Sequence, residues 1–237
     1  MSEEAFKQLI SGQSRGLAAC VGRGLLRCLS IPYSMLMQLR NAAFDIGLKA
    51  THRVDVPVIA IGNLTTGGTG KTPIVAFLVR QLQELGWRPG IVSRGYRADS
   101  SGENDEKRVL AGLCPGVPHE QNPDRIAAAR KLLAETDVDV IVLDDALQHR
   151  RIHRDLNVVL VDASNPFGYG YELPRGLLRE SLSGLKQADL VLILEPAPFQ
   201  AGSSTTRLKP RSATETQQRP VGHFAFRSAN QPGVAFG

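Results

Sequence analysis

Apolar residues recur in two different patterns along the 237-residue chain. Over residues 4–50 they follow a helical period. We predict two helices there, separated at Ser30-Ile31-Pro32, because proline is tolerated at the start of a helix but not inside one. One face of the first predicted helix carries Leu17, Val21, Leu25 and Cys28. Arginines interrupt any continuous apolar run, which indicates either a basic amphipathic helix on an anionic membrane surface or a packed helix with solvated arginines.

From residue 55 onward, short apolar runs alternate with helical stretches. The runs are rich in valine and isoleucine and predict buried strands at 57–61, 90–93, 138–143, 157–161 and 189–194. Helices are predicted over 73–85, closed by Gly86, and over 124–135. This alternation is typical of an α/β fold with a doubly wound, mostly parallel sheet, whose ligands bind at the carboxyl ends of the strands.

Residues 201–237 follow neither pattern. They are rich in serine, threonine, glutamine and proline, and we predict that they are disordered. The expected organisation is therefore N-terminal amphipathic helices over 1–54, an α/β domain over 55–200 and a tail over 201–237.

Composition excludes several classes of protein. The chain is 42% hydrophobic and 22% charged, an ordinary globular balance, and no apolar stretch approaches the roughly 18 residues that span a bilayer. The net charge of +5 divides into +4 for residues 1–54, −3 for the middle and +4 for residues 201–237, which argues against a nucleic-acid partner. Three cysteines without metal-ligand spacing predict reduced thiols in a cytosolic protein and no zinc site.

The clearest candidate for chemistry is the glycine-rich segment 62–73, which lies between the first predicted strand and the helix after it. Backbone N–H groups in such a loop converge on phosphate oxygens; Lys71 would reach the β- and γ-phosphates, and the Thr72 hydroxyl would bind Mg²⁺. The alternative is a glycine-rich turn that happens to precede Lys-Thr. The predicted nucleotide-binding residues are Thr65, Thr66, Gly67, Gly68, Thr69, Gly70, Lys71 and Thr72.

Acidic residues follow two of the predicted strands. Asp144 and Asp145 end the third strand, where an acid near Mg²⁺ is expected in a P-loop protein. Asp105 lies in a polar segment beyond the second strand and is either a candidate base for an attacking hydroxyl or part of a solvated charge run. His149 and Arg179 are candidates to bind phosphate or acceptor groups, or are ordinary surface residues.

Ordered motifs run through residues 10–197. They are Gly62–Thr65, Lys71–Pro73, Ser93–Tyr96, Asn104–Glu106, Asn122–Arg125, Asp144–His149, His153–Asp155 and Leu173–Glu180. Together they resemble the tetraacyldisaccharide 4′-kinase family of lipid A biosynthesis. Family members also carry threonine or serine where Thr65 replaces the first glycine of the loop.

The resemblance implies a P-loop NTPase-type fold that transfers the γ-phosphate of ATP to the 4′-hydroxyl of a tetraacyldisaccharide 1-phosphate at the cytoplasmic face of the bacterial inner membrane. It implies that residues 1–54 associate with that membrane and that Asp105 is catalytic together with Lys71. Thr72, Asp144 and Asp145 would form the Mg²⁺ site. The implied acceptor-binding residues are Arg94, Tyr96, Gln148, His149, Arg179 and Glu180.

Two alternatives to an active kinase stay open at this point. Family members continue into a second lobe that residues 198–237 do not match. The first alternative is therefore a truncated or frame-shifted product that binds nucleotide but transfers phosphate poorly or not at all. A GTPase-type switch is less favoured, because no [NT]-K-x-D guanine motif is present. The sequence leaves the oligomeric state open.

Overall fold

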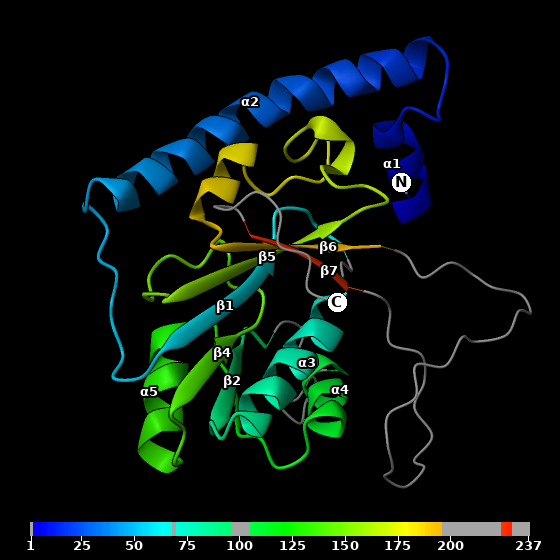
Figure 1. The fold of residues 1–237 in the computed structure, drawn as a ribbon. Helices are drawn as coiled ribbons and strands as arrows, with labels where there is room; N and C mark the ends of the chain where they lie inside the picture. Colours follow the sequence, from blue (N-terminus) through cyan, green and yellow to red (C-terminus); the bar gives the residue numbers. More distant parts are fainter. Residues whose placement is uncertain (1, 68–69, 96–104, 196–223, 229–237) are drawn as a thin grey trace, which may run out of the picture.

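In the described residues, a seven-stranded sheet organises the fold (Figure 1). The computed structural model describes residues 2–67, 70–95, 105–195 and 224–228. The strand order is β3-β2-β4-β1-β5-β6-β7, and all neighbours are parallel except β6 and β7. This confirms the predicted doubly wound α/β fold. The elements are α1 (Glu3–Ser11), α2 (Leu17–Asp45), β1 (Val58–Asn63), α3 (Lys71–Glu84), β2 (Pro89–Ser93), α4 (Asp105–Leu113), β3 (His119–Gln121), α5 (Arg125–Glu135), β4 (Val140–Leu143), β5 (Leu156–Asp162), the 3₁₀ turns η1 (Gly168–Gly170) and η2 (Leu182–Gln187), β6 (Leu190–Leu194) and β7 (Phe224–Ser228).

Both faces of the sheet are buried in hydrophobic layers. Alternate residues of β4 enter different layers, as the pleat of a strand requires: Val140 and Val142 pack with α3 and α4, whereas Ile141 and Leu143 pack with α5. Burial on both faces explains why the strands read as continuous apolar runs. The sheet thereby fixes the carboxyl ends of β1 and β4 side by side.

Besides the two 3₁₀ turns, three elements lie outside the sequence-based prediction. The helix α4 and the three-residue polar strand β3 have too little apolar pattern to be recognised. The third is β7, which pairs antiparallel with β6 inside the segment 201–237. The prediction that residues 201–237 are disordered is therefore wrong for Phe224–Ser228.

The predicted helix break at Ser30-Ile31-Pro32 is also wrong, because α2 continues through Pro32. Proline frees the carbonyl group of residue Cys28, but Cys28 and Pro32 both lie on the exposed side of the helix, where water can bind that carbonyl. The actual break lies between α1 and α2, where Gly12 and Gly16 adopt φ values of +86° and +105°. Residues with side chains rarely adopt such φ values.

The long helix α2 turns its polar side toward the protein and its apolar side outward. It lies over the segment between β5 and β6 (Figure 1). The Ser30 hydroxyl lies 3.0 Å from the carbonyl oxygen of Glu172, and the Tyr33 hydroxyl donates to the carbonyl oxygen of Arg179 at 2.8 Å. The apolar side, more than half exposed at each position, consists of Leu17, Val21, Leu25, Leu29, Ile31, Met35, Leu36 and Leu39. We call these eight residues the apolar stripe.

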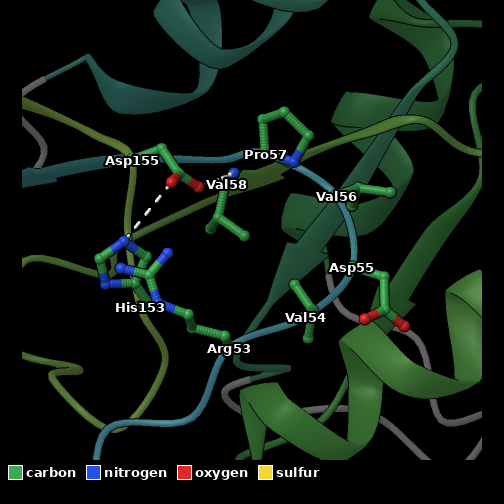
Figure 2. Close-up of a pocket in the computed structure, with 8 residues that line it drawn as sticks. All are labelled: Arg53, Val54, Asp55, Val56, Pro57, Val58, His153 and Asp155. Carbon is green, nitrogen blue, oxygen red and sulfur yellow. Dashed lines mark hydrogen bonds and ion pairs between the residues drawn. The ribbon is translucent and has the colours of Figure 1, made fainter.

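A small cavity of about 160 Å³ lies at the amino end of β1 (Figure 2). Asp155 closes one side of it by accepting the N–H of Val58 at 2.8 Å, and His153 Nε2 lies 3.4 Å from the other Asp155 oxygen. Arg53 lines the same cavity. Because this is the opposite end of β1 from the glycine-rich loop, the cavity is separate from the site described next.

Candidate active site

The glycine-rich loop connects β1 to α3, and backbone hydrogen bonds hold the first half of the loop in place. The backbone N–H of Thr66 donates to the carbonyl oxygen of Leu177 at 2.7 Å, and the N–H of Arg179 donates to Leu64 at the same distance. Gly70, at φ +68°, directly precedes Lys71, the first residue of α3. The loop therefore leads into a helix N-terminus, the arrangement that binds phosphate. Gly68 and Thr69 lie outside the described residues.

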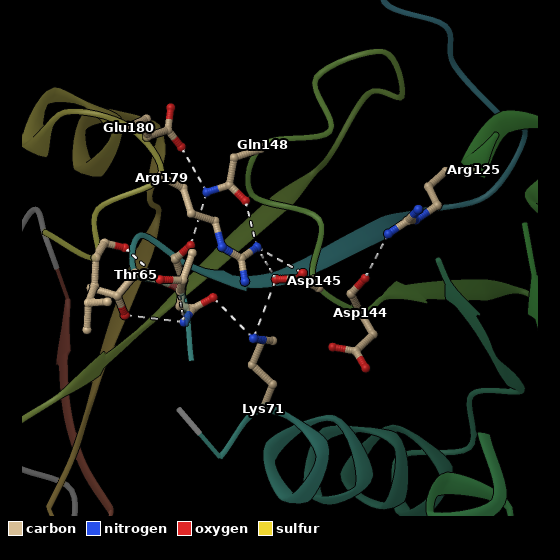
Figure 3. A network of polar contacts seen from close by, with 11 residues as sticks. Thr65, Lys71, Arg125, Asp144, Asp145, Gln148, Arg179 and Glu180 are labelled. Carbon is tan, nitrogen blue, oxygen red and sulfur yellow. Dashed lines mark hydrogen bonds and ion pairs between the residues drawn. The ribbon is translucent and has the colours of Figure 1, made fainter. Parts of the chain in front are cut away.

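Lys71 projects from the start of α3 toward the carboxyl ends of β1 and β4 (Figure 3). Its Nζ donates to Asn63 Oδ1 at 3.2 Å and lies 3.5 Å from Asp145 Oδ1. Asn63 is fully buried, and its amide donates to the carbonyl oxygen of Thr65 at 2.8 Å. Asn63 thus ties the orientation of the lysine to the backbone of the loop. Sequence reasoning did not single it out, although it is the last residue of the strand before the loop.

Asp144 and Asp145 follow β4 in adjacent but different environments. Asp144 is 1% exposed, and its carbonyl oxygen lies 3.5 Å from Arg125 Nη2. Asp145 has φ +50°, an unusual value for a residue with a side chain, which turns its carboxylate toward Lys71 and Arg179. Arg179 Nη1 lies 2.9 Å from both carboxylate oxygens. Burial alone would raise the pKa of Asp145, but Lys71 and Arg179 outweigh it and hold the pKa below its usual value.

Gln148 links this charged cluster to α2. Its amide donates to the carbonyl oxygen of Asn63 at 3.1 Å and to Glu180 Oε1 at 3.1 Å. The second Glu180 oxygen accepts from Asn41 Nδ2 at 2.8 Å, and Glu180 is 2% exposed. Glu180, one of the predicted acceptor-binding residues, therefore holds Gln148 and α2 together in this structure. Asn41 was not singled out, because an asparagine within a helix gives no motif.

The structure describes only some of the remaining predicted site residues. Arg94 is exposed just after β2. His149 follows Gln148, and burial together with Arg125 and Arg151 lowers its pKa to about 4, so it is neutral at pH 7. Tyr96 lies outside the described residues, as does the side chain of Asp105, the first residue of α4. The structure thus brings together Thr65, Lys71, Asp145, Gln148, Arg179 and Glu180 (Figure 3).

This arrangement can bind and orient a polyanion. Two cations, Lys71 and Arg179, flank one carboxylate at the mouth of a phosphate-type loop, and a buried acid lies beside it. No group of three or more histidine, cysteine, aspartate or glutamate residues in the described ranges is arranged to hold a metal ion by itself. A metal here would therefore need oxygen atoms from a ligand or from hydroxyl groups as well.

The comparisons with known proteins agree on one family. The sequence profile of the tetraacyldisaccharide-1-P 4′-kinases (LpxK) matches residues 23–234. The chain belongs to this family. The match extends beyond residue 197, where the motifs found in the sequence end, and covers most of the segment 201–237.

Among curated members of the tetraacyldisaccharide 4′-kinase family, the protein of Geobacter sulfurreducens is 40% identical over 204 residues, which cover 79% of this chain and 58% of the relative. The protein of Shewanella amazonensis is 42% identical over 182 residues, covering 71% and 51%. The crystal structure of LpxK from Aquifex aeolicus in complex with ATP superposes with a TM-score of 0.68 at 31% identity, covering 79% of this chain and 63% of that one. The chain thus spans between about half and two thirds of these relatives.

Proposed function

We propose that this chain is an ATP-dependent kinase that transfers the γ-phosphate of ATP to the 4′-hydroxyl of tetraacyldisaccharide 1-phosphate, the lipid A precursor. One observation carries the proposal: Lys71, at the N-terminus of α3, lies 3.5 Å from an aspartate that Arg179 also contacts. Phosphoryl transfer depends mainly on positioning and on neutralising charge, and this cluster supplies both. Membership of the kinase family and the ATP complex of the Aquifex aeolicus relative support it.

In the proposed reaction the loop 65–72 holds the phosphates of ATP. Backbone N–H groups and the dipole of α3 would face the phosphate oxygens, while Lys71 would contact the β- and γ-phosphates. Asn63 keeps the Lys71 ammonium at the end of β1 rather than free to rotate into solvent. The lysine therefore needs little reorganisation on binding nucleotide.

The donor set also fits Mg²⁺, a hard cation that prefers oxygen ligands. Thr72 would offer its hydroxyl group, and Asp144 and Asp145 would offer carboxylates at the carboxyl end of β4. When bound, the ion would neutralise charge on the phosphates. Asp145 meanwhile positions Lys71 and Arg179 through its contacts with both.

For the acceptor, we propose Asp105 as the base that takes the proton of the 4′-hydroxyl. Gln148, His149 and Arg179 would bind the acceptor beside the phosphate loop, together with Arg94 and Tyr96, while Glu180 positions Gln148. A neutral His149 can donate or accept one hydrogen bond to a sugar hydroxyl at pH 7. Arg179 would lie next to the transferred phosphate.

We further propose that residues 1–54 place the enzyme on the cytoplasmic face of the inner membrane. The apolar stripe of α2 faces away from the protein, and its polar side packs on the domain formed by residues 55–200. Within the described residues no helix is both long and apolar enough to cross a bilayer. A helix lying in the interface would bring the site to a lipid acceptor that stays in the membrane.

Transfer of labelled γ-phosphate from ATP to tetraacyldisaccharide 1-phosphate in detergent micelles tests the proposal. We expect transfer by the wild-type chain, and losses of at least about 100-fold in Lys71→Ala and Asp105→Ala. Lys131→Ala removes a cation that pairs with Glu120 on the surface and is expected to retain activity. Binding of Mg-ATP without transfer by the wild-type chain would contradict the proposal and identify a nucleotide-binding remnant.

A further inference from the structure

A second cavity, of about 350 Å³, lies where α2 ends against the turn that follows β4. Its side chains come from α2, from the segment 46–54 and from the turn 146–151. They include Arg40, Phe44, Lys49, His52, His149 and Arg151. Five of these six are basic residue types, and no acidic residue lines the cavity. None of the proposed steps of phosphate transfer uses Arg40, Lys49, His52 or Arg151.

The positive charge around this cavity is only partly compensated. Two acids pair with arginines of this region: Asp45 lies 2.5 Å from Arg150, and Asp124 lies 3.8 Å from Arg151. Three cations also surround the ring of Phe44, with Arg40, Lys49 and Arg150 between 5.3 and 5.7 Å from its centroid. Crowding of like charges in one place is costly unless an anion joins them.

Two of the residues that line the cavity also carry a polar atom without a partner. Within the part of the chain that the structure describes, Arg40 Nη1 and His149 Nε2 are buried without a hydrogen-bond partner. Arg40 Nη2, by contrast, donates to the carbonyl oxygen of Gln148. A buried donor that lacks an acceptor is unfavourable, so an acceptor-rich ligand that reaches the Arg40 guanidinium would stabilise this part of the cavity. Burial lowers the pKa of His149, and the nearby Arg125 and Arg151 lower it further.

Exposed apolar residues lie between the end of α2 and Lys49, which lines the cavity. Ile46 and Leu48 are 70% and 77% exposed. A helix that lies in the bilayer interface would hold the cavity at its carboxyl end at the depth of lipid headgroups. Basic residues at that depth meet phosphate groups, which accept several charge-assisted hydrogen bonds at once.

We propose that this cavity binds a phosphate group carried by a membrane lipid. The idea deepens the proposed kinase function, because a phosphate held here would fix the acceptor or the surrounding bilayer relative to Gln148, whose carbonyl oxygen Arg40 contacts. Two lipids carry such a group: the acceptor, through its 1-phosphate, and glycerophospholipids of the membrane. The cavity recognises the chemistry that they share.

Binding to vesicles of digalactosyldiacylglycerol, a neutral lipid without phosphate, measured by flotation without ATP, tests this directly. The vesicles would contain tetraacyldisaccharide 1-phosphate, the same lipid without its 1-phosphate, or phosphatidylglycerol. Arg151→Gln and Lys49→Gln remove cations from the cavity. Arg53→Gln, whose side chain lines the separate cavity of Figure 2, removes the same charge elsewhere and is the control. Thermal unfolding would establish that each variant is folded, and Lys49, exposed on the segment after α2, is the substitution least able to disturb the fold.

We expect each cavity variant to bind phosphate-bearing vesicles about tenfold more weakly than wild type, because it loses about one charge-assisted hydrogen bond. Binding to vesicles with the dephosphorylated lipid should stay within twofold of wild type. A loss confined to the disaccharide 1-phosphate assigns the cavity to the acceptor, and a loss that includes phosphatidylglycerol assigns it to lipid phosphate in general. Equal losses in Arg53→Gln, or equal losses with and without the phosphate, would overturn the proposal. Because no transfer is measured, this result is independent of whether the chain is an active kinase.

Discussion

Arg179 Nη1 lies 2.9 Å from both carboxylate oxygens of Asp145, and the same nitrogen lies 3.3 Å from Gln148 Oε1. The backbone of Arg179 is also fixed, because its N–H donates to Leu64 and its carbonyl oxygen accepts from Tyr33. One residue therefore joins the phosphate loop, the acid after β4 and helix α2. Its removal should affect both stability and the site.

Substitution Arg179→Ala is expected to lower the free energy of unfolding by about 2 kcal/mol at pH 7, since Asp145 loses a charge-assisted partner. The folded-state pKa of Asp145 lies below its unfolded value of ~3.9, so its ion pairs stabilise the fold above that pH. That stabilisation is lost as the pH falls through the folded-state pKa. Urea unfolding at several pH values should show wild type and variant converging in acid, and Arg53→Ala, at an exposed arginine elsewhere, should show no such convergence.

His149 should make the stability of the fold depend on pH over a different range. Its folded-state pKa is about 4, below the unfolded value of ~6.5, so the unfolded chain binds more protons between these values. Stability should therefore fall as the pH drops from 6.5 to 4, by up to about 3 kcal/mol from this residue. His149→Gln should unfold with a weaker pH dependence over that range. Identical profiles for wild type and His149→Gln would contradict the assigned burial.

The sequence was sufficient to predict β1, β2, β4, β5 and β6 and the glycine-rich loop at the carboxyl end of β1. Buried parallel strands are apolar on both faces, and a glycine-rich loop before Lys71 has a recognisable spacing. Pro32 misled the prediction, because the cost of proline within a helix depends on whether the freed carbonyl group is exposed. That exposure is set by tertiary packing.

The partners of the site residues were less predictable. Asn41 and Glu180 are separated by 139 positions in the chain and meet only because α2 packs on the segment after β5. Asn63 lies within the motif Gly62–Thr65, but the motif gives it no role, and its role follows from its burial between Lys71 and Thr65. Such contacts depend on tertiary structure, which one sequence does not encode in local spacing.

Gly62 sets how closely β1 approaches the turn after β4. A Cβ atom at this position would lie 2.6 Å from Leu147 Cβ and 2.7 Å from Leu147 N, and the backbone cannot yield easily. Gly62→Ala should destabilise the fold by about 1–3 kcal/mol and displace Asp145 from Lys71. Gly24→Ala is the matched control, because a Cβ there meets nothing within 4 Å and alanine favours the helix, with an expected gain of about 0.5–1 kcal/mol. Chemical unfolding measures both.

Thr72 tests the proposed metal site. Thr72→Val keeps the shape of the side chain but removes its hydroxyl, so we expect Mg²⁺-dependent ATP binding to weaken about tenfold, while Thr72→Ser retains it. Removal of Mg²⁺ with a chelator should bring wild type and Thr72→Val to the same affinity. A hydroxyl that served only to cap α3 would instead weaken binding equally with and without the metal.

The orientation of α2 predicts how the chain meets a membrane. Leu25 and Leu36 belong to the apolar stripe and are 61% and 64% exposed, so replacing both with glutamate removes little packing from the fold. In a bilayer interface each leucine side chain contributes about 1.5–3 kcal/mol of transfer free energy, and the double variant should bind vesicles at least about 100-fold more weakly. Leu85→Glu is the control, because Leu85 is 75% exposed at the end of α3, away from α2.

Phosphate transfer by the double variant should survive with acceptor dispersed in detergent and fall with acceptor held in vesicles. Only the second case requires the chain to reach a bilayer surface. Unchanged binding to vesicles would show that the stripe covers another surface instead.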